Sequence, residues 1–216
     1  MHAASDLSKL HGAVQRRLKR IKNCYRSLAA RPSTDRNLVI ANCVLELDNL
    51  NICALREFTI SSLRRARTVR GHRITVNRQF GPEPEIAAYI LSVVNSVRFT
   101  HIRMPISLRR DEEQTIRNPK DTEKILISCA ATNLPSMRNA LSLNASVFRD
   151  LSTVRNFYAH RNENTWKKVR DKAQALGIGS VVHPDDLVQS SILGRPLSLF
   201  EDWIAEAELF FDELMQ

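Results

Sequence analysis

The segment TVRNFYAHRNEN, residues 153–164, places an arginine, an asparagine and a histidine within six positions. Histidine, with an unperturbed pKa of about 6.5, takes or gives a proton near neutrality. Arginine stays cationic and can stabilise the charge that builds on a phosphoryl group during transfer. RNA supplies its own nucleophile, the 2′-hydroxyl. Arg155, Asn156 and His160 are therefore candidate catalytic residues for metal-independent RNA cleavage, with Arg155 on the phosphate, His160 as acid or base, and Asn156 orienting it.

The surrounding apolar spacing predicts that these residues lie on a helix. Because a side chain advances about 100° per residue, Asn156 and His160 lie about 40° apart, whereas Arg155 and His160 lie about 140° apart. Either the long Arg155 side chain reaches His160, or two copies of the helix share one site across a two-fold axis. The structural alternative is a capping or interfacial histidine, with Arg155 paired to an acid such as Asp150 or Glu163.

The sequence RNFYAH resembles the Arg-polar-x-x-x-His signature of the HEPN superfamily, small helical-bundle proteins common among bacterial toxins and defence nucleases. The resemblance implies a homodimer with a composite, metal-independent RNase site that leaves 2′,3′-cyclic phosphate or 3′-phosphate ends. Arg155 and His160 match the signature residues, and Asn156 its polar position. It also implies a controlling antitoxin or defence-system partner protein. In the branch controlled by a nucleotidyltransferase antitoxin a tyrosine follows two residues after the histidine, where this chain has Asn162, so that control is not expected.

The charge of the chain favours a phosphate-bearing partner. The formal charge is +9, with 24 arginines against 8 lysines, and guanidinium suits bidentate phosphate contacts. Charge that only keeps the chain soluble is the alternative. A basic insertion at about 64–83, a loop by its glycines and prolines, is predicted to bind an RNA strand; a solvated insertion is the alternative there. The predicted RNA-binding residues are Arg64, Arg65, Arg67, Arg70, His72, Arg73, Arg78 and, after the motif, Arg161.

Cysteine usage and hydropathy limit the remaining classes. The four cysteines show neither Cys-x-x-Cys nor a cysteine–histidine spacing typical of zinc, so we expect reduced thiols and neither a metal nor another cofactor. We expect that no apolar run approaches membrane-spanning length, and the first residues lack a signal-peptide core. A cytoplasmic protein with no membrane partner is predicted.

The apolar periodicity and the low glycine content predict an all-α fold, an antiparallel HEPN-like helical bundle with loop insertions, as a single domain over 1–216. Besides the basic insertion, a charged connector is expected at about 100–120. Helices are expected from Leu7 to before Pro32, over about 36–66, 84–100, 122–134, 136–160 and 165–177, in a short turn after His183, and over 198–215.

Particular residues carry these helix predictions. Asp121 and Thr122 are candidate caps, and Pro135 is expected to end the helix that they begin. Leu38 is expected in the core. The other core positions predicted for the second helix are Val44, Leu45, Leu55, Phe58 and Leu63.

Three functions compete at this point. The first is an RNA endonuclease of toxin or phage-defence type. The second is a non-catalytic HEPN-like module that binds RNA or a partner protein and uses the motif helix for dimerisation. A DNA-binding regulator is a weaker third, because no helix-turn-helix spacing with a basic recognition helix is found.

Overall fold

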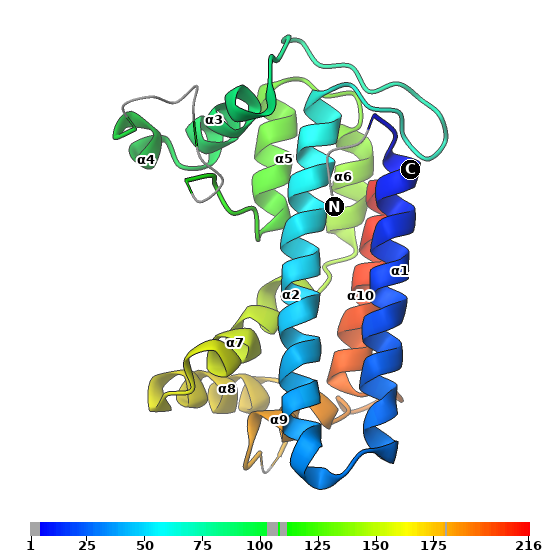
Figure 1. The fold of residues 1–216 in the computed structure, drawn as a ribbon, viewed down its shortest axis with the longest axis vertical. Helices are drawn as coiled ribbons and strands as arrows, with labels where there is room; N and C mark the ends of the chain where they lie inside the picture. The colour runs from blue at the N-terminus through cyan, green and yellow to red at the C-terminus, as the bar shows by residue number, and fades with distance from the viewer. Residues whose placement is uncertain (1–4, 103–107, 109–111, 180) are drawn as a thin grey trace. The chain divides into compact units, whose positions relative to one another are not determined.

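The computed structural model describes residues 5–102, 108, 112–179 and 181–216 (Figure 1). Residues 103–107 and 109–111 of the predicted charged connector lie outside the described residues. The helices are α1 (Leu7–Arg26), the 3-10 helix η1 (Ser27–Ala30), α2 (Ser33–Leu63), α3 (Glu83–Val94), α4 (Ser96–Thr100), α5 (Pro119–Ser128), α6 (Leu134–Ser142), α7 (Val147–His160), α8 (Glu163–Ala175), α9 (Pro184–Gln189) and α10 (Leu199–Leu214). No strand forms among the described residues, so the prediction of an all-α fold is confirmed.

Residue contacts divide the chain into two compact units. Unit 1 comprises Met1–Val14, Ile52–Asn144 and Phe210–Gln216, and unit 2 comprises Gln15–Asn51 and Ala145–Leu209. The helices α1, α2 and α10 each contribute residues to both units. The prediction of one domain over 1–216 is not decided by this division and stays a prediction.

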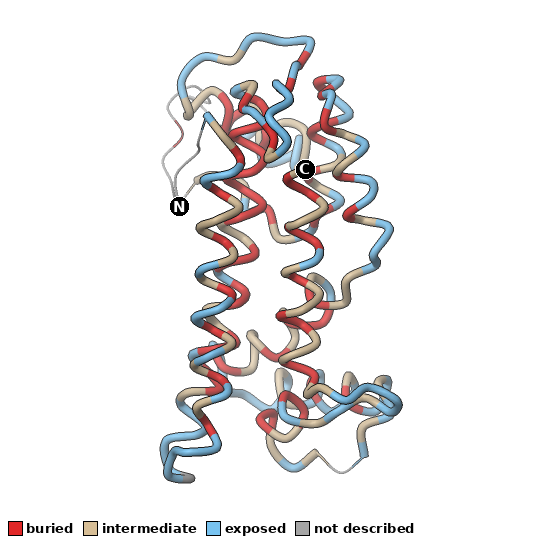
Figure 2. Tube along the Cα trace, turned by 90° about the vertical axis from the view of Figure 1, so that its right-hand side faces the viewer, coloured by how far each residue is buried: buried red, intermediate tan, exposed pale blue. Residues whose placement is uncertain are grey.

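The helices predicted from Leu7 to before Pro32 and over 198–215 form, and each carries a buried apolar stripe. Each stripe repeats at three or four residues, so its side chains lie on one face of the helix and pack inward. Figure 2 shows buried residues (red) along the long helices and exposed residues (pale blue) concentrated on the connections. The buried stripe residues are Leu7, Leu10, Val14, Leu18, Ile21, Tyr25 and Leu28 at the N-terminal end of the chain, and Leu199, Phe200, Trp203, Ile204, Ala207, Phe211 and Leu214 at the C-terminal end.

The prediction for Leu38 is wrong, because this side chain is 70% exposed. Leu38 lies nine residues before the buried Leu47, which places it about 180° away around α2. The neighbouring residues 34–37 are exposed as well, so Leu38 lies in a stretch of α2 that the described residues leave uncovered. Leu45 is half-buried, whereas Val44, Leu55, Phe58 and Leu63 are buried as predicted.

The expectation of no membrane-length apolar run is also wrong for α2. Residues Thr34–Leu63 are long and apolar enough to cross a membrane by length and hydropathy alone. However, 56% of the most apolar window is buried inside the protein, as in the core helix of a globular fold. The buried face of the same helix also carries the charged residues Asp48, Arg56 and Glu57. We therefore describe α2 as a core helix.

Several predicted helices are divided by caps. The helix predicted over 84–100 stops at α3, and α4 begins anew where the Asn95 side chain accepts a hydrogen bond from the Arg98 N–H at 3.1 Å. Pro84 lies in the first turn of α3, a position that proline favours. The helix predicted over 136–160 is likewise two helices, α6 and α7. A side-chain acceptor that satisfies a first-turn N–H favours a new start over a continuous helix.

The start of α5 and the role of Pro135 also differ from the prediction. The cap of α5 is Asn118, whose side chain accepts from the Lys120 N–H at 3.0 Å, with Pro119 in the first turn. Asp121 and Thr122 thus lie inside the helix. Pro135 does not end α5, which stops at Ser128; it lies in the first turn of α6, where proline needs no N–H partner.

The basic insertion of unit 1 is held by buried apolar side chains. Ala66, Ile74 and Val76 are buried, and the Ile74 N–H donates to the Ala66 carbonyl at 2.9 Å. The Asn77 N–H donates to the carbonyl of Cys129 at 2.9 Å, which ties the loop to the end of α5. The insertion is therefore a packed loop whose inward residues fix its course, and its arginines lie between them.

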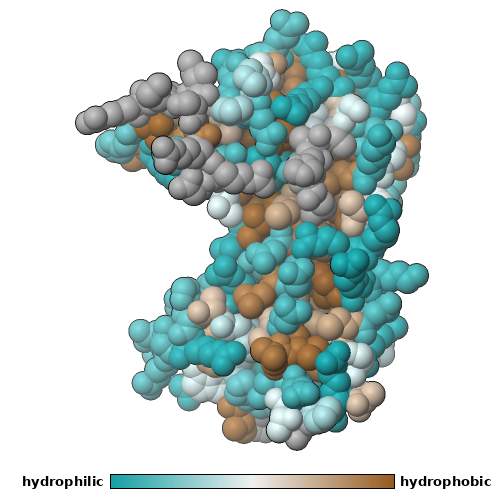
Figure 3. Space-filling view, in the orientation of Figure 1, coloured by the Kyte–Doolittle hydropathy of each residue, from teal (hydrophilic) through white to brown (hydrophobic). Residues whose placement is uncertain are grey.

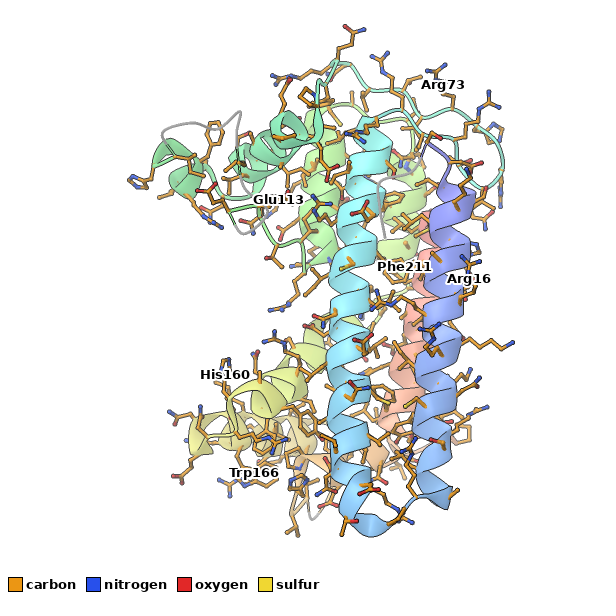
Figure 4. All side chains as sticks on the ribbon, viewed as in Figure 1. Arg16, Arg73, Glu113, His160, Trp166 and Phe211 are labelled. Atoms are coloured by element: carbon orange, nitrogen blue, oxygen red, sulfur yellow. The ribbon has the colours of Figure 1, made fainter. Side chains whose placement is uncertain are left out.

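A buried ion-pair cluster occupies the other side of unit 1. The guanidinium of Arg56 lies 2.7 Å from carboxylate oxygens of Glu57, Glu83 and Glu113. Burial alone would lower the pKa of Arg56, but hydrogen bonds to Glu113 and Glu83 outweigh it and raise the pKa. Figure 4 labels Glu113, which joins the connector to α2. Because the Arg56 guanidinium is held by three carboxylates from different segments of unit 1, we assign the cluster a structural role.

The acidic face of α10 pairs with basic side chains of α1 within each unit. The pairs are His11–Asp212 in unit 1, and Lys22–Glu208 and Arg26–Glu201 in unit 2. Their nitrogen–oxygen distances are 2.6, 3.7 and 3.0 Å. Part of the basic surface of α1 is therefore used inside the fold. Figure 3 shows a mainly hydrophilic surface with apolar patches on the drawn face.

Candidate functional site

The motif residues emerge from α7 of unit 2, which is anchored at its first turn. Val147, Leu151, Val154 and Tyr158 are buried at intervals of three or four residues, so one face of α7 is part of the core. The Val147 N–H, which has no partner inside the helix, donates to Glu206 Oε2 at 2.9 Å. Packing and this cap fix the helix that carries the candidate catalytic side chains.

A buried acid of α7 ties it to α8. Asp150 is 1% exposed and lies 2.9 Å from Arg149 Nε and 2.8 Å from Lys172 Nζ. Burial would raise the pKa of Asp150, but the hydrogen bonds from Arg149 and Lys172 outweigh it and hold the pKa below its usual value. Figure 1 shows α7 and α8 side by side in unit 2. Asp150 therefore forms ion pairs with Arg149 and Lys172, and in the described structure it does not pair with Arg155.

Arg155 pairs with Asp48 of α2. Its Nε lies 3.3 Å from Asp48 Oδ2, and its Nη1 donates to Asn156 Oδ1 at 3.3 Å. The Asp48 side chain is 5% exposed, whereas the Arg155 side chain is 27% exposed. The pair therefore fixes Arg155 while part of it stays in contact with solvent.

Sequence reasoning missed Asp48 as the partner of Arg155. The available signal was an acid on the buried face of an apolar helix, between Leu47 and Leu50. A carboxylate at such a position requires a cation or several hydrogen bonds to offset its desolvation. Asn51, one turn further on, is also buried, and its Oδ1 has no hydrogen-bond partner. The pairing itself depends on how α7 packs against α2, which spacing within α2 does not reveal.

His160 is the last residue of α7 and is exposed (Figure 4). In the described part of the chain it makes no hydrogen bond or ion pair, so its imidazole is accessible to a ligand. The next residue, Arg161, is exposed in the left-handed region with φ +42°, and its N–H donates to the Phe157 carbonyl at 2.7 Å.

Hydrogen bonds connect only two of the three predicted catalytic residues. Arg155 and Asn156 share a hydrogen bond, whereas among the described residues no bond joins His160 to either of them. Arg155 is directed to Asp48, and its position lies about 140° around α7 from that of His160. Within one chain, therefore, the anchored Arg155 and the exposed His160 lie on different sides of α7.

On the buried face of α7, Tyr158 begins a series of hydrogen bonds that leads to Asp185 and His183. Its hydroxyl donates to Asp185 Oδ1, and the backbone N–H of Asp185 donates to His183 Nδ1 at 3.2 Å. Burial raises the pKa of Tyr158, and the hydrogen bond to Asp185 adds to that effect. Burial also raises the pKa of Asp185, although hydrogen bonding from Tyr158 opposes it. The prediction of a short helical turn after His183 is confirmed as α9, with His183 as its cap.

All the predicted RNA-binding residues except Arg161 lie on the basic insertion of unit 1, and most are exposed. Figure 4 labels Arg73, which extends away from the helices. The exposed residues are Arg64, Arg67, Arg70, His72, Arg73 and Arg78, and Arg65 is half-buried with φ +60°.

Arg64 of the insertion forms an ion pair with Glu83 at 3.9 Å, and three further side chains of the insertion make contacts with uncharged groups. Arg65 Nη2 donates to the Val76 carbonyl at 3.3 Å, and Arg70 Nε donates to the Gln216 side chain at 3.0 Å. Arg78 stacks over Phe80 and Tyr89, with Cζ at 5.6 and 5.3 Å from the ring centroids. The contacts with uncharged groups orient these three side chains without neutralising their charge. They are compatible with a phosphate-binding surface.

Comparison with protein-family models, with curated proteins and with solved structures finds no match to this chain. Among the described residues no group of three or more histidine, cysteine or acidic side chains is placed to hold a metal ion.

Proposed function

We propose that the chain is a metal-independent RNA endonuclease of the HEPN type, acting as a homodimer. The observation that supports this most is the contrast between the two motif side chains. Arg155 is held by a buried carboxylate yet remains part exposed, and His160 stands accessible at the end of the same rigid helix. A positioned cation and an accessible acid–base group are the minimum that cleavage through the 2′-hydroxyl requires.

The directions of the two side chains favour a site shared by two copies. Because Arg155 is drawn toward Asp48, His160 of the same chain meets a phosphate from another side of α7. A two-fold axis beside α7 would bring two histidines and two arginines to one phosphate, as an isologous interface requires. The bundle fold, the homodimer and a controlling partner protein are part of this proposal.

In the proposed reaction one His160 removes the proton of the 2′-hydroxyl, and O2′ attacks the adjacent phosphorus. The bond from phosphorus to the 5′-oxygen breaks, and the second copy's His160 protonates that oxygen. The products are a 2′,3′-cyclic phosphate and a 5′-hydroxyl. Arg155 stabilises the negative charge on the phosphoryl oxygens, and Asn156 positions the Arg155 guanidinium through its 3.3 Å hydrogen bond.

A specific observation supports a second candidate, the non-catalytic binding module. The ion pair with Asp48 is by itself a structural reason for an arginine at position 155, since the buried carboxylate needs a cation. In that case the exposed arginines of the basic insertion bind RNA, and α7 serves only in assembly.

Cleavage separates the two candidates. Purified wild type, Arg155→Ala and His160→Ala are incubated with total RNA in excess EDTA, and the ends are mapped. The nuclease proposal predicts cyclic or 3′-phosphate ends with wild type, and no cutting by His160→Ala with RNA binding retained. Arg36→Ala, which removes an exposed arginine in the first turn of α2 in unit 2, is the matched control and should cut like wild type.

A further inference from the structure

A surface pocket of about 430 Å³ lies beside the motif helix in unit 2. Its walls come from the end of α7, the first turns of α8 and the residues before α9. The lining residues are Phe157, Asn162, Glu163, Trp166, Val182, His183 and Pro184. None of these residues belongs to the predicted catalytic triad. The pocket begins one helical turn before His160, because Phe157 precedes it by three residues.

Aromatic rings form the sides of the pocket. The Phe157 ring lies 6.1 Å from that of Trp166 and 6.0 Å from that of His183, with the His183 ring perpendicular to it. Arg170 covers Trp166 from the outside, with Cζ at 5.7 Å from the ring centroid. Val182 at the rim is 83% exposed. The rings are thus fixed by protein neighbours while the space between them is open to solvent.

The polar side chains that line the pocket are Asn162, Glu163 and His183. Asn162 and His183 already form hydrogen bonds within the protein. The Asn162 side chain accepts from the Thr165 N–H at 3.0 Å as the cap of α8. His183 Nδ1 accepts from the Asp185 N–H, which leaves its Nε2 as the outward nitrogen. Glu163 is exposed, and in the described structure it makes no hydrogen bond or ion pair. A carboxylate at the rim of an aromatic pocket accepts hydrogen bonds and selects ligands that donate them.

Four cations lie close in sequence to the pocket residues of α8, together with the acids Glu163 and Asp171. The side chains of Arg161, Lys167, Lys168 and Arg170 are exposed on or next to the first half of α8. Flat aromatic walls next to cations are the combination that binds a base by stacking and its phosphates by charge. An uncharged apolar ligand would gain nothing from those cations.

We infer that this pocket binds a single unstacked nucleobase that carries an exocyclic amino group, as part of a single-stranded RNA that passes His160. Phe157 and Trp166 supply the stacking surface, and Glu163 accepts from the amino group of adenine, cytosine or guanine, which uracil lacks. The base belongs to a nucleotide flanking the cleaved one. This inference rests on the proposed function for the identity of the strand, but its test does not require cleavage.

The test measures binding of a short oligoadenylate with 2′-O-methyl groups, which cannot be cut through the 2′-hydroxyl. The probe is titrated into the full-length wild-type chain. Trp203 is fully buried, so a change in tryptophan fluorescence reports Trp166. We expect quenching with the oligoadenylate, weaker binding of the matching oligouridylate, and weaker binding of an oligomer with abasic positions.

Variants assign the binding to the pocket. Trp166→Ala should weaken binding by about 5- to 150-fold, the range for one lost base–aromatic stack, and Trp166→Phe should restore most of it. Phe157→Leu keeps an apolar side chain should Trp166→Ala fail to fold, and it should weaken binding in the same way. Glu163→Gln should reduce the preference for adenine over uracil. Leu209→Ala, which removes a 51% exposed apolar side chain on α10, is the control.

Equal affinity of wild type for the base-bearing and the abasic oligomer, or unchanged affinity in both Trp166→Ala and Phe157→Leu, would overturn the inference. That result is expected if the pocket instead binds a side chain of a partner protein. If the pocket binds the base but wild type cuts no RNA, the proposed nuclease fails and the pocket stands. If wild type cuts RNA and the pocket variants bind normally, only the pocket assignment fails.

Discussion

Replacing Asp48 by alanine tests the ion pair on which the position of Arg155 depends. The variant leaves the guanidinium of Arg155 beside an apolar helix without its carboxylate, which lies 3.3 Å away in the protein. Breaking a buried pair by removing one partner costs about 3–5 kcal/mol. Because 27% of the Arg155 side chain is exposed, water compensates part of that loss. We therefore expect a decrease of about 1–3 kcal/mol in the free energy of unfolding.

Thermal unfolding followed by circular dichroism measures this loss. For a chain of this size a loss of about 2 kcal/mol lowers Tm by about 4–8 °C. A double-mutant cycle with Arg155→Ala then isolates the pair from the packing lost with either side chain. We expect the double variant to be more stable than the sum of the two single losses predicts, by about 1 kcal/mol or more. Strictly additive losses, within about 0.5 kcal/mol, would refute the assignment of Asp48 as the anchor of Arg155.

Three further predictions concern the packing and the titration of the two units. The pKa of Asp150 is lowered in the folded chain, so its stabilisation is complete above its unfolded pKa of about 3.9 and is lost as pH falls through the folded value. Urea unfolding of wild type and Asp150→Asn should therefore differ most at neutral pH and converge in acid; a constant difference would contradict this. Leu47→Ala should cost about 2–5 kcal/mol, whereas Leu38→Ala, at a 70% exposed position, should leave Tm nearly unchanged; equal losses would show that the burial pattern of α2 is wrong. Burial raises the pKa of Cys43 to about 12, so a maleimide at neutral pH should label the half-buried Cys53 well before Cys43, and mass spectrometry of the folded protein would show the reverse order if this assignment is wrong.

The helical fold was predictable from the sequence because its signals are local. The stripe from Leu7 to Leu28 repeats at helical spacing and is buried throughout, and the stripe of α10 behaves in the same way. Helix ends were less predictable, since they depend on which of several polar residues caps the chain. Asn95 and Asn118 accept first-turn hydrogen bonds, and each places a helix start that periodicity alone did not indicate.

The errors have a common physical origin in contacts distant in sequence. Leu38 has the apolar side chain typical of core residues but lies away from the packed face of α2. Only the arrangement of the neighbouring helices decides which face of α2 is packed. Asp48 and Arg155 are 107 residues apart in the chain, and no pattern within either helix identifies the other partner. The aromatic pocket likewise combines α7, α8 and the segment before α9. The residue types of the candidate site were predictable, whereas their partners were not.

The most direct test of the central claim is the cleavage of RNA by the purified chain in excess EDTA, with wild type compared to His160→Ala. We predict that wild type cuts and leaves 2′,3′-cyclic phosphate or 3′-phosphate ends, and that the His160→Ala variant binds RNA but leaves it intact. Cutting by His160→Ala at the wild-type rate, or RNA left intact by a folded wild-type dimer, would contradict the assignment of His160 as the acid–base group.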